Sequence, residues 1–135
     1  MPGGVGSREQ RLQGGVMSYL ALLTDSYDAI THFYGQQLHF PVIEQWDRAN
    51  ARGLRYSLGD MRLEILDNQR EKDPLPLGDP ADRIQVVIEV SNIEEARAGI
   101  DIEAPPTQST SWGARLFQLR DPDGVPVTFL EWSET

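Results

Sequence analysis

The sequence predicts an α+β fold in which two βαβββ modules bring their mixed sheets together around a cavity. Each half of the chain shows a strand, a polar helix cap and a short amphipathic helix, and each half ends in a hairpin. The two caps, Asp25 and Asn92, are 67 positions apart (92 − 25), and the matching last-strand positions, Glu64 and Thr128, are 64 apart (128 − 64). Two copies are too few for a solenoid, so this spacing indicates a duplicated module.

The length of 135 residues fits a single domain with four segments. Residues 1–15 carry Gly and Arg without an apolar run, and we expect a disordered arm there. Residues 16–66 form the first predicted module and residues 67–80 a Pro-rich linker. Residues 81–135 form the second module.

The first module begins with an apolar strand over Val16–Leu23. Asp25, with Asp28 three residues on, is typical of a helix N-terminus. Apolar residues then recur at helical spacing until Pro41 ends the helix. Val42–Trp46 follows as a strand.

A hairpin closes the first module, with Gly59-Asp60 as its two-residue loop. This register pairs Arg55 with Glu64 across the ladder, close enough for an ion pair. One face is wholly apolar and the other mixed. The apolar face consists of Leu54, Tyr56, Leu58, Met61, Leu63 and Ile65.

The second module repeats this plan more weakly. Arg83–Val90 alternates as a strand, and Asn92 with Glu95 predicts a helix cap. Pro105-Pro106 allows only an edge strand or extended segment in 102–110. The closing hairpin, Trp112–Trp132, turns at Asp121-Pro122-Asp123-Gly124, where Asp121 can bond the backbone two residues on and Gly124 can take a positive φ.

The closing hairpin also has two faces. Phe117, Leu119, Val127 and Phe129 form an apolar face, while Leu116, Gln118, Thr128 and Leu130 form a mixed face. A strand pair of this kind typically covers helices on one side and meets water or a ligand on the other.

Composition excludes several classes of function. The chain has no Cys, which removes disulfides, zinc–thiolate sites and cysteine nucleophiles. Its formal net charge of −9 disfavours nucleic acid and anionic membranes as partners. No apolar run could span a bilayer, and we expect a cytoplasmic protein.

Several motifs, in order, resemble one known family. They are Leu23-Thr24-Asp25, Phe33-Tyr34 with Leu38-His39-Phe40, Leu63-Glu64-Ile65-Leu66, Val90-Ser91-Asn92 with Glu95-Ala96, Pro105-Pro106-Thr107, Trp112-Gly113-Ala114-Arg115 and Asp121-Pro122-Asp123-Gly124. In this order they resemble the vicinal-oxygen-chelate superfamily of glyoxalases, bleomycin-resistance proteins and dioxygenases. The resemblance spans about Val16 to Trp132 and implies the glyoxalase/bleomycin resistance/dioxygenase fold, which hosts many chemistries.

The resemblance also implies positions for metal ligands. These fall on Ser18, seven residues before Asp25, and on Glu64, Gln85 and Thr128, all expected on the cavity side. Only Glu64 is a competent ligand, because zinc, iron and nickel want imidazole or several carboxylates. His32 and His39 belong to the first helix and its end, on the wrong side of the sheet. We therefore expect vestigial positions, no metal and no cofactor.

The cavity-facing residues give a candidate ligand site. Its members are Trp46, Arg55, Glu64, Gln85, Trp112, Gln118 and Thr128. Arg55 would neutralise Glu64; with Arg55 turned away, Glu64 becomes the best candidate for a catalytic base. The tryptophans could supply flat walls for an aromatic or cationic ligand, or simply pack at the rim.

Three functions are compatible with this pattern. The first is metal-free binding or sequestration of a small cationic or aromatic molecule, such as an antibiotic. The second is a metal-dependent lyase, isomerase or dioxygenase of the same superfamily. The third is a partner module whose cavity is filled by Leu20, Leu22, Leu66 and Leu130. In each case the resemblance implies a homodimer, which would also cover edge strands.

Overall fold

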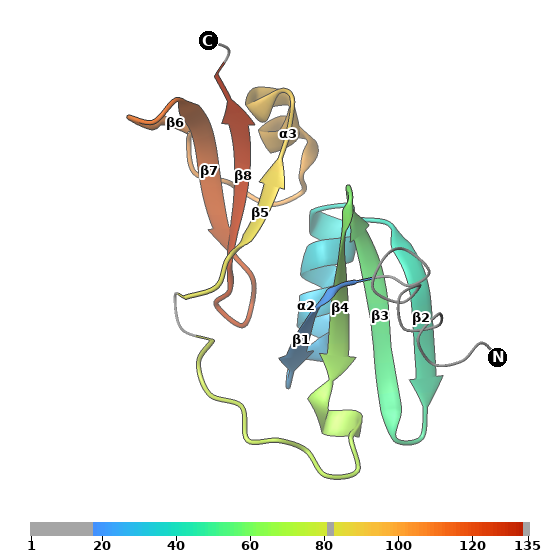
Figure 1. Cartoon of the computed structure of the whole chain (residues 1–135). Coiled ribbons are helices and arrows are strands. Elements are labelled where there is room, and N and C mark those ends of the chain that lie inside the picture. Colours follow the sequence, from blue (N-terminus) through green and yellow to red (C-terminus); the bar gives the residue numbers. More distant parts are fainter. Residues whose placement is uncertain (1–17, 81–82, 134–135) are drawn as a thin grey trace, which may run out of the picture.

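The computed structural model describes residues 18–80 and 83–133, so the predicted arm at 1–15 lies outside the described residues. Two four-stranded mixed sheets confirm the predicted α+β fold (Figure 1). The first sheet has the order β1-β4-β3-β2, with β1 Leu20–Thr24, β2 Val42–Arg48, β3 Ala51–Leu58 and β4 Met61–Asp67. The second has the order β5-β8-β7-β6, with β5 Val86–Glu89, β6 Gln108–Ser109, β7 Ala114–Arg120 and β8 Pro126–Trp132.

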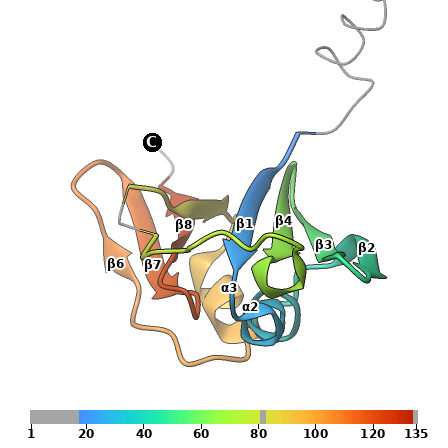
Figure 2. The same cartoon turned by 90° about the horizontal axis from the view of Figure 1, so that it is seen from below.

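The helices are short and all belong to connections between strands. Helix α2 (Tyr27–Thr31) continues directly into the π-helical segment η1 (His32–Gln37). A 3₁₀ turn, η2 (Asn68–Arg70), follows β4, and α3 (Ile93–Gly99) follows β5. Figure 2 shows α2 and α3 beneath the same side of the two sheets, which leaves the opposite faces of both sheets uncovered by helices.

The core lies between the helices and the sheets. The predicted apolar faces of both hairpins are buried there: Leu63 and Ile65 are 0% exposed, and Phe117 stacks on Phe129 with ring centroids 4.9 Å apart. Leu20 pairs with Leu63 and Leu22 with Ile65, so these two leucines belong to the helix side. The expectation that they fill the cavity is therefore wrong, because parallel neighbours share a face.

The first hairpin has the predicted register. Leu58 pairs with Met61 next to the Gly59-Asp60 loop, and Arg55 pairs with Glu64. Because side chains alternate along a strand, this register places the side chains of Arg55 and Glu64 on the same face, away from the helices.

One of the two predicted helix caps is confirmed. The Asn92 side chain accepts a hydrogen bond from the Glu95 N–H at 3.0 Å. Helix α2 begins one residue later than expected, with Ser26 as its N-cap and without a side-chain capping bond. Asp25 instead accepts hydrogen bonds from the amides of Asn68 and Gln69, which lie in the turn after β4.

A buried carboxylate joins the two modules. The Tyr34 hydroxyl donates to Asp121 Oδ2 at 2.7 Å, while Asp121 Oδ1 accepts from the N–H groups of Asp123 and Val125. Asp121 thus makes the predicted turn bond, and Gly124 has the predicted positive φ of 93°. Burial raises the pKa of Asp121, and the hydrogen bond from Tyr34 opposes that rise. A second link runs from the Asp101 N–H to the Gln37 carbonyl.

Candidate functional site

An ion-pair cluster occupies the uncovered face of the first sheet. Arg55 Nε donates to Glu64 Oε2 at 2.8 Å, which confirms the predicted pair, and Arg55 Nη1 pairs with Glu44 on β2. Glu64 is only 5% exposed, so its charge needs this partner. Burial alone would lower the pKa of Arg55, but the hydrogen bond and charge of Glu64 outweigh it and raise the pKa. The guanidinium is therefore a permanent cation on this face.

Two aromatic rings flank the same guanidinium. Its carbon lies 4.3 Å from the centroid of the Tyr19 ring and 5.2 Å from that of Trp46. Gly53 makes room for Trp46, because a Cβ at residue 53 would lie 2.7 Å from Trp46 Cζ2. We call Tyr19, Glu44, Trp46, Arg55 and Glu64 the arginine cage.

Ser18 is not part of this cage. Ala21 pairs with Glu64 and Leu20 with Leu63, so alternation places Tyr19 on the side of Glu64 and Ser18 on the other side. Ser18 lines a shallow hollow with Asp60 and Met61 at the hairpin end. The predicted position was one residue early because it was counted from Asp25, whereas the helix cap is Ser26.

The second sheet brings together three of the predicted residues. Thr128 Oγ1 donates to Gln85 Oε1 at 2.7 Å, and Gln118 Nε2 donates to Thr128 Oγ1 at 3.0 Å. Gln85 and Gln118 also line a hollow of about 190 Å³. This amide–hydroxyl chain carries no charge, and among the described residues the amide N–H groups of Gln85 and the side-chain carbonyl of Gln118 have no further hydrogen-bond partner.

An exposed aromatic pair lies at the far end of the same sheet. The rings of Trp112 and Trp132 meet edge to face with centroids 5.4 Å apart, and they are 55% and 51% exposed. Trp132 shares the face of Thr128 and Leu130 by alternation along β8. Trp112 was predicted as a wall, whereas Trp132 was missed although the same alternation identifies it.

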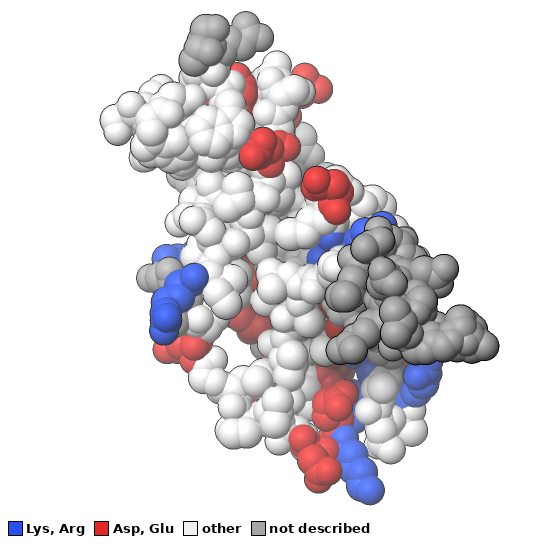
Figure 3. Space-filling model, in the orientation of Figure 1, with Lys and Arg blue, Asp and Glu red and all other residues white. Residues whose placement is uncertain are grey.

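The two sheets present these groups separately. Within the described residues, no hydrogen bond or ion pair joins the arginine cage to the amide–hydroxyl chain of Gln85, Gln118 and Thr128. A cleft of about 760 Å³ does open between β1, residues 77–80 and the turn at 121–125, but none of the predicted ligand residues lines it. Figure 3 shows mainly uncharged surface over the second module, interrupted by separate acidic groups and, at its lower left, by a basic group.

The donor set does not fit the metal site that the fold family implies. Glu64 is already bound to a guanidinium, Tyr19 stands where a ligand would be needed, and Gln85 and Thr128 bond to each other. No group of three or more His, Asp or Glu side chains suited to a metal ion occurs in residues 18–80 and 83–133. Transition metals prefer imidazole or several carboxylates, which this face lacks.

Sequence reasoning also missed Arg62. It pairs with Ser57 in the hairpin and shares the face of Glu64 by alternation. In the part of the chain that the structure describes, its Nε is buried without a hydrogen-bond acceptor. A buried donor in this condition costs free energy.

With this geometry in place, the comparisons with known proteins identify the family. The chain matches the Glyoxalase/Bleomycin resistance protein/Dioxygenase superfamily over residues 16–129 and belongs to it. A search of the curated proteins finds no significant match.

Several solved structures share the fold. A glyoxalase/bleomycin resistance protein/dioxygenase from Nocardioides is 22% identical, with a TM-score of 0.65 and coverage of 97% of this chain and 95% of that one. TnmS3, an antibiotic binding protein from Streptomyces sp. CB03234, is 16% identical, with a TM-score of 0.60 and coverage of 87% and 98%. A lactoylglutathione lyase from Agrobacterium tumefaciens is 17% identical, with a TM-score of 0.55 and coverage of 88% and 95%. At these identities the likeness concerns the fold alone.

None of the helices in the described part of the chain is both long and apolar enough to cross a membrane.

Proposed function

We propose that this chain is a metal-free binding protein that sequesters a small aromatic or cationic molecule, such as an antibiotic, on the uncovered sheet faces. In this proposal the protein acts in the cytoplasm and needs no cofactor. An antibiotic-binding protein and a lyase both share this fold, so the fold alone does not choose between binding and catalysis. The choice rests on the residues of the site.

The arginine cage carries the proposal. Where a metal enzyme of this superfamily would present its ligands, the carboxylate of Glu64 holds a guanidinium instead. Because Arg55 already pairs with both carboxylates, the cage offers a guest the flat surfaces of the Tyr19 and Trp46 rings. The face is therefore suited to grip a flat guest and poorly suited to anchor a catalytic ion.

The second sheet supports the same reading. Its face offers the uncharged groups of Gln85 and Gln118 for orientation and the exposed Trp112–Trp132 pair for stacking. Solvent-exposed tryptophans with polar neighbours are typical of ligand-binding surfaces. Glu89, exposed on the same face of β5, adds a carboxylate that favours a cationic guest.

We further propose that the protein is a homodimer. No helix of the described residues covers the sheet faces that carry the arginine cage and the Gln85–Thr128 pair, and a partner chain would convert these two faces into enclosed clefts. The exposed apolar side chains of Val87, Trp112 and Trp132 are consistent with burial against a guest or a partner. Light scattering of the full chain should give twice the chain mass; a mass equal to one chain contradicts the dimer.

Tryptophan fluorescence offers a direct test of ligand binding. Trp46 belongs to the arginine cage, and Trp112 and Trp132 form the exposed pair, so all three tryptophans of the chain are placed to respond to a guest. We expect saturable quenching by bleomycin or by ethidium, a planar aromatic cation, with matching heat in calorimetry. The anionic probe 1-naphthoate should bind more weakly.

Matched variants locate the binding. Trp132→Ala should weaken binding of the best probe, whereas Gln108→Ala, on the exposed edge strand β6, should leave it unchanged. Binding of 1-naphthoate alone, with no response to either cationic probe, contradicts the proposal.

The alternative is a metal-dependent lyase, isomerase or dioxygenase. One observation favours it: Glu44 and Glu64 converge on one point, the Arg55 guanidinium, so two carboxylates would meet if that side chain moved aside. Ligand binding that disappears in EDTA and returns with Zn²⁺ or Ni²⁺ would favour this alternative over metal-free binding.

A further inference from the structure

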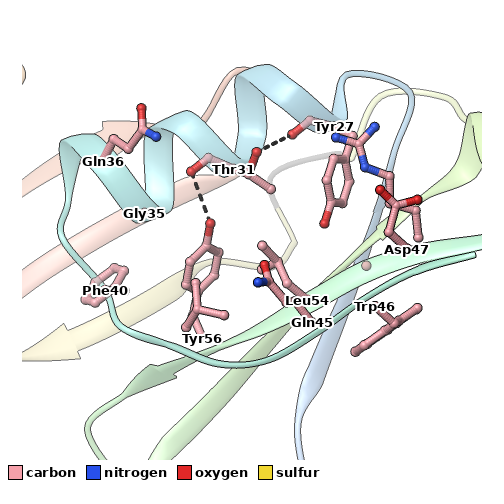
Figure 4. Close-up of a pocket in the computed structure, with 13 residues that line it drawn as sticks. Tyr27, Thr31, Gly35, Gln36, Phe40, Gln45, Trp46, Asp47, Leu54 and Tyr56 are labelled. Carbon is pink, nitrogen blue, oxygen red and sulfur yellow. Dashed lines mark hydrogen bonds between the residues drawn. The ribbon is translucent and has the colours of Figure 1, made fainter.

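A slot beside the arginine cage opens on the helix side of the first sheet, and Trp46 is the one cage residue that also lines it. It lies between α2–η1 above and the β2–β3 edge below, with a volume of about 590 Å³ (Figure 4). That volume falls in the range of pockets that hold small molecules. The slot exists because β2 extends beyond the cover of the helix, so that the side chains of β2 are exposed along most of the strand.

The glycine at position 35 and a hydrogen bond of Tyr56 shape the slot. A Cβ at Gly35 would lie 2.9 Å from Tyr56 Oη, so the helix closes tightly on Tyr56 without adding a side chain of its own. The Tyr56 hydroxyl donates to the Thr31 carbonyl at 3.1 Å, which fixes the ring as one wall. Gly35 lies in the π-helical segment η1, and such segments are found frequently at functional sites.

The lining combines an apolar floor with a polar rim. Leu54 and Tyr56 rise from β3 into the slot, and Phe40 lies at one end in Figure 4. Gln45 projects from β2 into the same space, while Trp46, its neighbour, projects from the opposite side of the strand. The amide of Gln45 is exposed and has no hydrogen-bond partner among the described residues, so both its carbonyl and its N–H groups are available.

The charges around the slot select an uncharged ligand. Arg52 is paired with Asp28 at 2.9 Å and with Asp67 at 3.6 Å, and its guanidinium lies over the Tyr27 ring. Asp47 is paired with Arg70. Since each charged group on the rim already has a counter-charge, an anion or a cation would have to break an existing pair in order to gain one.

We propose that this slot is a second binding site, for a small uncharged aromatic compound that carries an amide or similar carbonyl group. The ring lies against Leu54, Tyr56 and Phe40, and the amide pairs with the side chain of Gln45. The slot and the arginine cage share only Trp46, because Leu54 and Tyr56 face the helix while Arg55, between them on β3, faces the other way. A ligand here would therefore contact the reverse side of the strand that carries the arginine cage.

Benzamide is a suitable probe, because it combines one ring with one neutral amide. A ¹H–¹⁵N NMR titration of the full chain should give saturable shifts at residues 31–36, 45 and 54–56. Benzoate and benzamidine, the matched anion and cation, should bind more weakly. Gln45→Ala should weaken benzamide binding by about 3- to 10-fold through loss of its hydrogen bonds, whereas Gln108→Ala should not change it.

The outcomes separate this site from the arginine cage. Unchanged benzamide binding in Arg55→Ala, with weaker binding in Gln45→Ala, supports the slot. Shifts at Tyr19, Glu64 or Trp132 with none at residues 31–36 or 45, loss of binding in an Arg55→Ala variant that keeps the circular dichroism spectrum of the parent, or no saturable shift at any soluble concentration each overturns it. Gln45 is exposed on an edge strand, so its variant should fold, and a circular dichroism spectrum like that of the parent confirms that a loss of binding is local.

Discussion

Replacing Arg55 with Leu removes the cation from the arginine cage and leaves Glu64 without its partner. The side chain of Glu64 is 7% exposed and that of Arg55 19% exposed, so the pair is largely withdrawn from water. Breaking a fully buried ion pair costs about 3–5 kcal/mol; because Arg55 retains some solvent and also serves the exposed Glu44, we expect a loss of about 2–3 kcal/mol in the free energy of unfolding.

A double-mutant cycle separates the pair from the other contacts of Arg55. Glu64→Gln should recover part of the loss when combined with Arg55→Leu, giving a coupling of about 1.5 kcal/mol, because the double variant leaves no buried charge unpaired. Urea unfolding at pH 7, followed by far-ultraviolet circular dichroism, measures all four corners.

Arg115→Leu is the matched control for this cycle. Arg115 is also an arginine on a strand with an acidic partner, Glu94, but the two side chains are 40% and 55% exposed. An exposed pair of this kind contributes no more than about 1 kcal/mol. Equal losses for Arg55→Leu and Arg115→Leu, or a coupling below about 0.5 kcal/mol, would refute the reasoning.

Three further variants test the scaffold by urea unfolding. Tyr34→Phe should lower the free energy of unfolding by about 1.5–3 kcal/mol at pH 7, because the buried Asp121 carboxylate loses a hydrogen-bond donor. Burial has raised the pKa of Asp121, so the contribution of this carboxyl group to stability is fully present at low pH and is lost as the pH rises through that pKa. The stability difference between Tyr34→Phe and the parent should therefore shrink as the pH falls through the same value. An equal loss of stability in Tyr34→Phe above and below the pKa of Asp121 would contradict a charged Asp121 carboxylate as the acceptor of this hydrogen bond. Asn92→Ala should lower the free energy of unfolding by about 1 kcal/mol, because it removes the hydrogen bond from the Glu95 N–H. An unchanged free energy of unfolding would mean that this cap does not stabilise the helix. Gly124→Ala should cost about 1–2 kcal/mol, because φ at this turn is positive; a stability equal to the parent would show that the turn relaxes freely.

Much of the fold was predictable because its elements are specified locally. Alternation along the hairpins and the two-residue loop at Gly59-Asp60 fixed both the register and the buried faces, including the Arg55–Glu64 pair. The turn at Asp121 was readable from its own residues. These features depend on neighbours in sequence or directly across one ladder.

The candidate site was only partly predictable because it depends on offsets and distant contacts. The error at Ser18 arose from a helix that begins at Ser26 rather than Asp25, and a shift of one residue exchanges the two faces of a strand. The contact between Tyr19 and Arg55 joins residues 36 positions apart. The slot beside Gln45 depends on how far β2 extends past the helix, which no local pattern records.

Metal content measures the central claim most directly. The chain, purified without chelator, is incubated with Zn²⁺, Ni²⁺ and Mn²⁺ in turn, separated from free metal by gel filtration and analysed by mass spectrometry for bound metal. If the arginine cage replaces the metal site, each sample should hold far less than one ion per chain, and Glu64→Gln should leave that value unchanged. One ion per chain that disappears in Glu64→Gln would contradict the metal-free site.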